Sequence, residues 1–385
     1  MMKFLLLLAS LFGLPALAQA PVSGTTPAPV VSAKSYLLID FQSRQVLAAR
    51  NPEMRAEPAS LTKLMTAYVV FDALRQKRIT LEQRFVTSEK AWRAPGARMF
   101  LTAGESVSVE NLLSGLIVQS GNDAALTLAE GVAGSEDAFV DNMNREAARL
   151  GLKNSSFVNA TGLAHPQHYS TATDLAALSR ALVEEFPQYL PMYKLRDFQH
   201  NGITQYNRNR LLGRDPYVDG LKTGHTDSAG FCMVATALRN DRRVIAVVLD
   251  AVSETTRAID AQKLLNYGFE AFDTVKLYSA GEPIHALPVW KGNSETLPAG
   301  LTADYFVTLP KGFFQRLKPT VASMQPLMAP IRVGDRVGTL QLSFDGRPFD
   351  EKQLVALESV GMAGLLVRAW HGLRLMYRDF SAAMP

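Results

Sequence analysis

The chain has 385 residues, a length that favours two or three domains over one. Hydrophobic residues make up 47% and charged residues 20%, so the composition excludes an intrinsically disordered chain and a polytopic membrane protein. The single cysteine, Cys232, excludes a disulfide framework and any metal site built from several cysteines. The net charge of +4 is spread along the chain and does not demand nucleic acid as a partner.

The first 18 residues have the pattern of a secretory signal peptide. One basic residue precedes an apolar run over 4–17, and small residues follow it. The run is short for a transmembrane helix, so an uncleaved anchor is the less favoured alternative. Cleavage is expected after Ala18 rather than after Ala20, because Pro21 would directly follow the second cut. Export would separate the protein from nucleic acid, ATP and NAD, and it excludes most cytoplasmic chemistries.

The mature chain begins with a leader and continues with mixed helices and strands. Residues 19–34 are rich in Pro, Ser, Thr and Ala and are predicted to be flexible. The segment 36–50 has two apolar runs around a polar turn, which is typical of a β-hairpin. Helical spacing of apolar residues follows over 64–74, 109–118, 124–132, 136–150 and 173–185. Two β-branched runs, 229–238 and 244–251, predict a second antiparallel hairpin, and 255–272 predicts a closing helix.

These elements predict two successive architectures. The βαβ alternation of a doubly wound sheet is missing, so residues 35–275 are expected to form an α+β domain with an antiparallel sheet and a cluster of helices. Short apolar runs between Gly and Pro turns then predict a small all-β domain over 276–350.

The tail, residues 351–385, has the pattern of an amphipathic helix. At about 100° per residue, one broad face collects the apolar side chains of Leu354, Met362, Leu365, Leu366, Trp370, Leu373, Met376, Tyr377 and Phe380. The opposite side collects Arg368, His371, Arg374 and Arg378. A basic amphipathic helix of this kind is typical of a membrane interface. We therefore expect an exported, periplasmic protein attached to the outer leaflet of the inner membrane; the alternative is a helix docked on its own domain.

The segment Ser60-Leu61-Thr62-Lys63 lies where the helix 64–74 is expected to begin. A spacing of three residues places Ser60 and Lys63 on one face of a helix. A neutral lysine can take the proton of a serine hydroxyl, and burial or nearby positive charge lowers a lysine pKa toward that state. The alternative is a serine that caps the helix and a lysine in solvent.

Two further short motifs each occur once in the chain. Ser120-Gly121-Asn122 lies in the break between two predicted helices, where Ser120 and Asn122 can both point into a cleft. The alternative is a loop in which Asn122 caps the next helix. Lys222-Thr223-Gly224 precedes the second hairpin and would offer a cation, a hydroxyl and an open backbone to a peptide that binds as an added strand. The alternative is that these residues form only a turn before the hairpin. Each motif alone is weak, whereas the three in this order are specific.

This set of motifs is found in class A β-lactamases and penicillin-binding proteins. The chain resembles the low-molecular-weight penicillin-binding proteins, the serine-type D-alanyl-D-alanine carboxypeptidases of peptidase family S11, and the resemblance covers nearly its whole length. It implies a β-lactamase/transpeptidase-like catalytic domain, a small β domain and a C-terminal amphipathic helix. It also implies removal of the terminal D-Ala from peptidoglycan pentapeptides, acylation by β-lactam antibiotics, and no cofactor or metal.

The resemblance assigns a role to each residue of the first two motifs. Ser60 would be the nucleophile that forms the acyl-enzyme, and Lys63 would be its general base. Ser120 would relay a proton to the leaving D-alanine nitrogen, and Asn122 would hold the substrate amide.

The resemblance also assigns roles around the third motif. Lys222 would supply positive field that keeps the general base neutral and attracts the terminal carboxylate. Thr223 and Gly224 would line the strand edge, and the backbone N–H groups of His225 and of the nucleophile would form the oxyanion hole. Arg257 matches the family's arginine near the carboxylate pocket, since a carboxypeptidase must bind a free carboxylate. The alternative for Arg257 is an arginine on the surface of a helix.

Other candidates are assigned to structure. His165 and His168 have a metal-ligand spacing, but they lie in a Pro-containing loop with no carboxylate in phase, so we expect a loop. The segment 159–163 matches a family loop near the site and is expected to be structural, and Cys232 is expected to be buried and inert. Three arginines are predicted to lie in a solvated loop, namely Arg208, Arg210 and Arg214.

Two alternatives stay open for the function. A class A β-lactamase needs a glutamate in an E-x-x-L-N setting, and the one Leu-Asn pair, Leu265-Asn266, has Gln262 in its place. The second alternative is a non-catalytic wall-binding protein on the same fold. The three intact motifs argue against it. Nucleic acid is not expected, because the chain has no motif that would bind it.

Overall fold

The computed structural model describes residues 27–382, with side chains at the C-terminal end described to residue 378. The predicted signal peptide and most of the leader lie outside the described residues. The described chain forms two units. The first unit comprises 28–280 together with 303–311, and the second comprises 281–302 together with 312–382.

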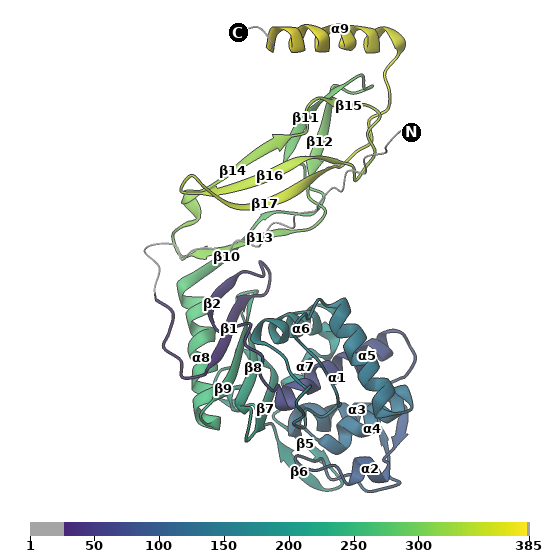
Figure 1. The fold of residues 1–385 in the computed structure, drawn as a ribbon, viewed down its shortest axis with the longest axis vertical. Coiled ribbons are helices and arrows are strands. Elements are labelled where there is room, and N and C mark those ends of the chain that lie inside the picture. Colours follow the sequence, from purple (N-terminus) through teal and green to yellow (C-terminus); the bar gives the residue numbers. More distant parts are fainter. Residues whose placement is uncertain (1–26, 383–385) are drawn as a thin grey trace, which may run out of the picture. The chain divides into compact units, whose positions relative to one another are not determined.

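The first unit is built on a five-stranded antiparallel sheet with the order β2-β1-β9-β8-β7 (Figure 1). Its strands are β1 (Ser35–Asp40), β2 (Val46–Arg50), β7 (Val218–Thr226), β8 (Gly230–Arg239) and β9 (Arg242–Ala251). Both predicted hairpins are confirmed. The strand that carries Lys222-Thr223-Gly224 is β7, which lies at an edge of the sheet and leaves one side of its backbone unpaired within the sheet.

The two faces of this sheet are buried by different helices. Side chains alternate along β9, since successive residues of a strand point to opposite faces. Ile245 and Val247 pack with the helical cluster, whereas Val244 and Ala246 pack with α8 (Glu254–Ala271). The long helix α8 covers one face of the sheet in Figure 1, and the other helices of the first unit cover the second face.

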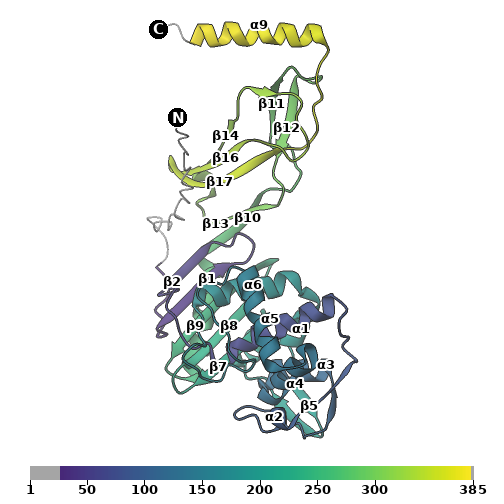
Figure 2. The same cartoon turned by 45° about the vertical axis from the view of Figure 1, so that its right-hand side comes forward.

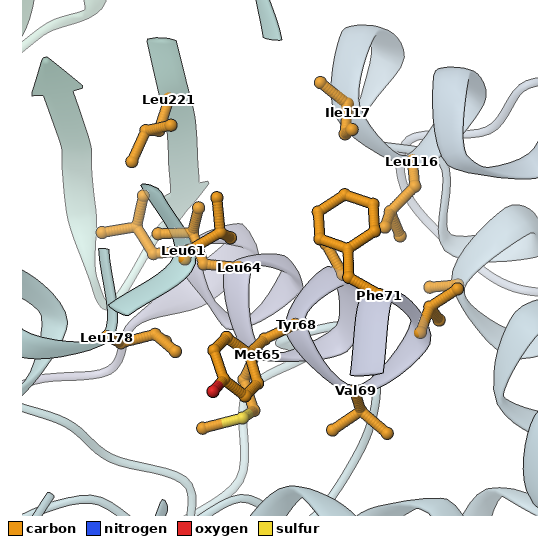
Figure 3. Close-up of a cluster of buried hydrophobic side chains, with 14 of the residues drawn as sticks. Leu61, Leu64, Met65, Tyr68, Val69, Phe71, Leu116, Ile117, Leu178 and Leu221 are labelled. Carbon is orange, nitrogen blue, oxygen red and sulfur yellow. The ribbon is translucent and has the colours of Figure 1, made fainter. Parts of the chain in front are cut away.

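The helical cluster surrounds one central helix, α1 (Figure 2). The cluster consists of α1 (Lys63–Arg75), α2 (Glu89–Trp92), α3 (Val109–Ser114), α4 (Asn122–Ala133), α5 (Glu136–Arg149), α6 (Ala172–Glu185) and α7 (Leu190–Tyr193). Residues 63–74 of α1 are all buried, as expected of a helix that is apolar around its circumference. Figure 3 shows α1 side chains in the core beside Leu178 of α6 and Leu221 of β7. This packing fixes the start of α1, where the Ser60-x-x-Lys63 motif lies.

Short paired strands complete the first unit. The pairs are β3 (Arg84–Val86) with β4 (Ser106–Ser108), β5 (Asp197–His200) with β6 (Ile203–Tyr206), and β10 (Phe272–Tyr278) with β13 (Tyr305–Pro310). The predicted helix over 109–118 is regular only as far as Ser114 and ends in a wide π-helical turn, Gly115–Gln119. The next residue, Ser120, adopts a left-handed backbone conformation with φ of 67°.

The second unit is a six-stranded sheet with the order β14-β16-β17-β12-β11-β15, followed by a helix. Its elements are β11 (His285–Trp290), β12 (Thr296–Gly300), β14 (Leu317–Ser323), β15 (Leu327–Met328), β16 (Arg336–Phe344), β17 (Arg347–Ala356) and α9 (Leu365–Ala382). The β11–β15 pair is parallel, and the other pairs are antiparallel. The predicted α+β fold, small all-β domain and C-terminal helix are confirmed.

Three predicted boundaries differ from those in the structure. The helix expected from Glu351 begins only at Leu365, because residues up to Ala356 form β17, which pairs with β16 and β12. Leu354, assigned to the apolar face of the helix, is buried in that strand. The flexible leader expected up to residue 34 ends earlier, since Val31 and Ala33 are buried in the first unit. The boundary between the two units falls at 280, a few residues later than expected, and β13 returns to the first unit.

A buried ion pair links strands of the main sheet across β8. Arg243 of β9 donates two hydrogen bonds of 2.7 Å to the carboxylate of Asp219 in β7, and one of 2.8 Å to Thr236 of β8. Both charged side chains are at least nine-tenths buried. The pair therefore holds β7 in register.

Removal of one partner of this pair should destabilise the first unit strongly. Asp219→Ala would leave the Arg243 guanidinium buried without its carboxylate, which costs about 3–5 kcal/mol. We expect the urea concentration at the midpoint of unfolding to fall clearly when unfolding is monitored by circular dichroism. Glu89→Ala, which removes one partner of an exposed ion pair with Arg93, is the control and should cost about 0–1 kcal/mol. Equal effects of the two variants would contradict a structural role for the buried pair.

Candidate functional site

A cavity of about 360 Å³ lies where the start of α1, the break before α4, the edge strand β7 and the start of α8 meet. It brings together residues from all three sequence motifs, which are separated by up to 164 positions in the chain. The residues that line it are Ser60, Gly96, Ala97, Ser120, Asn122, Thr161, Gly162, Leu163, Arg208, Thr223, Gly224, His225, Thr226, Phe231, Glu254 and Arg257.

The Lys63 amine lies beside the Ser60 hydroxyl at the start of α1. Ser60 lies on a short helical turn, Ala59–Thr62, that leads into α1, and Lys63 Nζ is 3.1 Å from Ser60 Oγ. Nζ also donates to Asn122 Oδ1 and to the Thr161 carbonyl, each at 2.6 Å. Burial lowers the pKa of Lys63 to about 7, the positive charge of Arg208 acts in the same direction, and Asp123 opposes it. The amine can therefore lose and regain a proton near neutral pH.

The loop 159–163 holds the Thr161 carbonyl against Lys63. Within the loop, Asn159 Oδ1 accepts from the N–H groups of Thr161 at 3.2 Å and Gly162 at 2.7 Å. Gly162 has a φ of +81°, and a Cβ there would lie 1.9 Å from the Ala59 carbonyl oxygen. Only glycine permits this approach to the turn that carries Ser60. The loop, which the sequence assigned to structure alone, thus supplies a hydrogen-bond acceptor to the site.

The second motif places two polar side chains in the cavity. Ser120 Oγ is buried and has no hydrogen-bond partner among the described residues, so it is left for a group that enters the cavity. Asn122 Nδ2 donates to the Pro95 carbonyl at 2.6 Å, while Oδ1 accepts from Lys63. Asn122 therefore orients the amine of Lys63 as well as lining the cavity.

The third motif approaches the turn that carries Ser60. A Cβ on Gly224 would lie 3.0 Å from the Pro58 carbonyl oxygen and 3.1 Å from the Ser60 backbone nitrogen, so the glycine permits close contact between the strand and the turn. Lys222 is buried, and its Nζ donates to the Thr223 carbonyl at 3.1 Å. Burial lowers the pKa of Lys222 well below its ordinary value, and the charges of Lys63, Arg208 and Arg257 act in the same direction.

Arg257 belongs to the cavity rather than to the helix surface. It is 5% exposed, and its Nη1 donates to the Gly224 carbonyl at 3.0 Å. Its guanidinium carbon lies 5.6 Å from the centroid of the Phe231 ring, and that ring stacks on His225 at 4.0 Å. One guanidinium therefore joins the edge strand to the aromatic wall of the cavity.

Several residues of the cavity were not assigned to the site from sequence. Arg208 was expected in a solvated loop, yet it lines the cavity, with Nε donating to the Gln119 carbonyl at 3.1 Å. Glu254, Phe231 and the loop at 96–97 were missed as well. None of these residues lies in one of the three motifs, and Glu254 directly precedes the expected helix 255–272, so no local pattern assigned them to the site.

The H-x-x-H spacing does not form a metal site. His168 is buried, its Nε2 lies 2.8 Å from Thr62 Oγ1, and its Nδ1 accepts from the Val158 N–H at 3.3 Å. Burial lowers the pKa of His168 to about 4. Within residues 27–382, no three His, Cys, Asp or Glu side chains cluster in a way that could hold a metal ion.

Both parts of the chain match families of known proteins. Residues 22–253 match the family described as D-alanyl-D-alanine carboxypeptidase, and residues 272–361 match the C-terminal domain of penicillin-binding protein 5. The D-alanyl-D-alanine carboxypeptidase DacC of Escherichia coli K12 is 38% identical over 364 residues, which cover 92% of this chain and 91% of that protein.

Solved structures are similar over the same range. Penicillin-binding protein 5 from Haemophilus influenzae superposes with a TM-score of 0.85 at 38% identity and covers 88% of this chain and 100% of that one. Ampicillin-bound penicillin-binding protein D2 from Listeria monocytogenes has a TM-score of 0.59 at 32% identity and covers 63% of this chain and 100% of that one. The resemblance inferred from the motifs is confirmed: the chain belongs to the D-alanyl-D-alanine carboxypeptidase family of low-molecular-weight penicillin-binding proteins.

Proposed function

We propose that this carboxypeptidase removes the terminal D-Ala of peptidoglycan pentapeptides through an acyl-enzyme on Ser60. The observation that carries the proposal is the Lys63 amine, 3.1 Å from Ser60 Oγ in the cavity, with a pKa lowered to about 7. A neutral amine that donates its two hydrogens to Asn122 and Thr161 keeps its lone pair for the Ser60 hydroxyl. The contacts of Lys63 thus suit a general base.

The acylation step can be followed atom by atom. Lys63 takes the proton of Ser60 Oγ as this oxygen attacks the carbonyl carbon of the penultimate D-Ala. The negative charge on the carbonyl oxygen is stabilised by the backbone N–H groups of Ser60 and His225. The C–N bond then breaks, and the proton held by Lys63 passes through the Ser120 hydroxyl to the leaving nitrogen. Lys63, neutral again, takes a proton from the water that attacks the ester on Ser60. That proton returns to Ser60 Oγ as the ester bond breaks and the shortened peptide leaves.

The part of the cavity lined by Thr223 and Arg257 suits a free carboxylate. Thr223 offers a hydroxyl on the edge strand, and Arg257 offers a guanidinium that is fixed by the Gly224 carbonyl. Arg208, which also lines the cavity, adds a second guanidinium to the surroundings. The terminal carboxylate of the peptide would bind here, with the peptide lying along β7 as an added strand.

The same chemistry would make the protein a target of β-lactam antibiotics. Its relative from Listeria monocytogenes has been solved with ampicillin bound. In the cavity described here, Glu254 is the single acidic side chain among the lining residues, and both of its oxygens accept from arginines. It is therefore poorly placed to activate water against the acyl-enzyme, and we expect a penicilloyl adduct that persists rather than β-lactamase turnover.

Mass spectrometry of the wild type and Ser60→Ala tests the nucleophile. With a pentapeptide ending in D-Ala-D-Ala, the wild type should release one D-Ala, and with penicillin it should gain a penicilloyl group on Ser60. Ser60→Ala should show neither event, because its side chain has no nucleophilic oxygen. An adduct without peptide turnover would favour the non-catalytic alternative, and rapid loss of the adduct would favour a β-lactamase.

The pH dependence of acylation tests Lys63. Because the neutral amine is the base, the acylation rate should rise roughly tenfold per pH unit below about pH 7 and level off above it. Arg208→Gln should move the midpoint upward, since loss of a nearby positive charge makes the protonated lysine more favourable. Stopped-flow measurement with a fluorescent penicillin between about pH 5 and 9 gives both profiles. A flat profile would refute this role of Lys63.

We also propose that α9 attaches the exported protein to the outer leaflet of the inner membrane. No described helix is both long and apolar enough to span a bilayer. The apolar side chains of α9 are nevertheless exposed, with Leu366 at 88% and Tyr377 at 75%. Its other side contacts the second unit, where His371 Nδ1 accepts from the Lys291 N–H at 2.8 Å and the ring packs on Trp290. The docked helix thus leaves its apolar face free for a lipid surface.

Two changes to α9, a deletion and a double substitution, should weaken membrane binding. Deletion of 364–385 keeps the bridges of Met362 with Gly292 and of Val360 with Ile331, so the second unit should stay folded. In the full chain, Leu366→Glu with Leu373→Glu places charges on the apolar face and should weaken binding by more than about tenfold. Val333→Glu, at another exposed apolar site, is the matched control. Flotation with phosphatidylethanolamine/phosphatidylglycerol vesicles measures binding; variants that still float would refute the anchor, and penicillin acylation checks that the site is intact.

A further inference from the structure

Glu254 stands out in the cavity because it is the single acidic residue among those that line it. It is the first residue of α8 and lies in the same turn as Arg257. Its carboxylate is shared between two arginines. Oε1 accepts from Arg257 Nη2 at 3.3 Å, and Oε2 accepts from Arg210 Nη2 at 2.8 Å.

The two arginines differ in their freedom to move. Arg257 is 6% exposed at its side chain and is fixed by the Gly224 carbonyl, whereas the side chain of Arg210 is 52% exposed. Glu254 is 36% exposed, so it lies at the rim. The contact with Arg257 is the longer of the two and the easier to give up. A small rotation of Glu254 toward Arg210 would free Nη2 of Arg257 while the carboxylate keeps a cationic partner.

We propose that Glu254 competes with the terminal carboxylate of the substrate for Arg257 and thereby sets the affinity of the cavity for C-terminal carboxylates. This inference rests on the proposed function, in which the terminal carboxylate binds at Arg257. In the free enzyme Glu254 holds the outer nitrogen of the guanidinium. When substrate binds, its carboxylate takes that place, and Glu254 pairs with Arg210 alone.

The competition lowers the affinity for substrate and does not change the rate of the chemical step. An incoming carboxylate must displace an internal one and then lie near its negative charge. Removal of the Glu254 charge should therefore lower KM for a substrate with a free carboxylate, by roughly three- to tenfold for one partly solvated charge. The reacting bond lies at Ser60, so the change should fall on KM and not on kcat.

Two substitutions should act in opposite directions. Glu254→Gln keeps the size of the side chain, removes its charge and should lower KM for a peptide ending in D-Ala-D-Ala. Arg210→Gln removes the alternative partner of Glu254, holds it on Arg257 and should raise KM. Asp304→Asn is the matched control, because it also removes one negative charge but from an ion pair with Lys276 that lines no part of the cavity. Its KM should stay at the wild-type value.

A ligand without the carboxylate makes the test specific. The same peptide ending in D-alaninamide is added as a competitor, and its inhibition constant should be equal in the wild type and Glu254→Gln. Thermal melting of each variant confirms folding, and Glu254→Asp, which withdraws the carboxylate by one methylene, should lower KM by a smaller amount if the glutamine variant does not fold.

The outcomes separate this inference from the proposed function. An unchanged or raised KM in Glu254→Gln would overturn it, because Glu254 would then only position Arg257. An equal gain in affinity for the amide would overturn it too, since the effect would not depend on the carboxylate. In both cases the wild type still turns over peptide, whereas a wild type that neither cleaves peptide nor forms a penicilloyl adduct overturns the proposed function and this inference together.

Discussion

The burial of one lysine amine is the constraint on which the site depends. Lys63 Nζ lies within hydrogen-bond distance of Ser60, Asn122 and the Thr161 carbonyl, which come from three separate segments of the chain. A charged amine is costly to bury, whereas a neutral one with these partners is satisfied. The fold must therefore hold a turn, a helix start and a loop at fixed distances. The central helix α1, buried along its length, provides the support for that arrangement.

Glycines permit the segments to come this close. Gly162 and Gly224 face the turn around Ser60 from two sides, and a Cβ at either position would crowd the backbone of that turn. The loop and the edge strand can therefore both reach the serine. The buried pair of Arg243 and Asp219 fixes β7 against the rest of the sheet, so the edge strand keeps its register beside the site. The packing of the core therefore also fixes the distances between the residues of the site.

Local patterns were informative where neighbours in sequence are also neighbours in space. The i,i+3 spacing of Ser60 and Lys63, the break at Ser120 and the two hairpins around the main sheet were all predictable, because helix and strand periodicity are local properties. The tail shows the limit of such patterns. Residues up to Ala356 have apolar spacing compatible with a helix, but pairing with β16 and β12 makes them a strand. The end of the leader was also not predictable from local patterns, because Val31 packs on residues more than 200 positions away.

The sequence alone determined the family, the three motifs, the class of fold and the presence of a basic amphipathic C-terminal helix. Each of these features depends on residue type and on short-range spacing along the chain. Tertiary structure decided which charges share the cavity. It placed Arg208 beside the lysines, where its charge lowers the pKa of Lys63, and it placed Glu254 between Arg210 and Arg257. Electrostatic energy depends on distance and burial in space, so no pattern of residues along the chain could reveal these contacts.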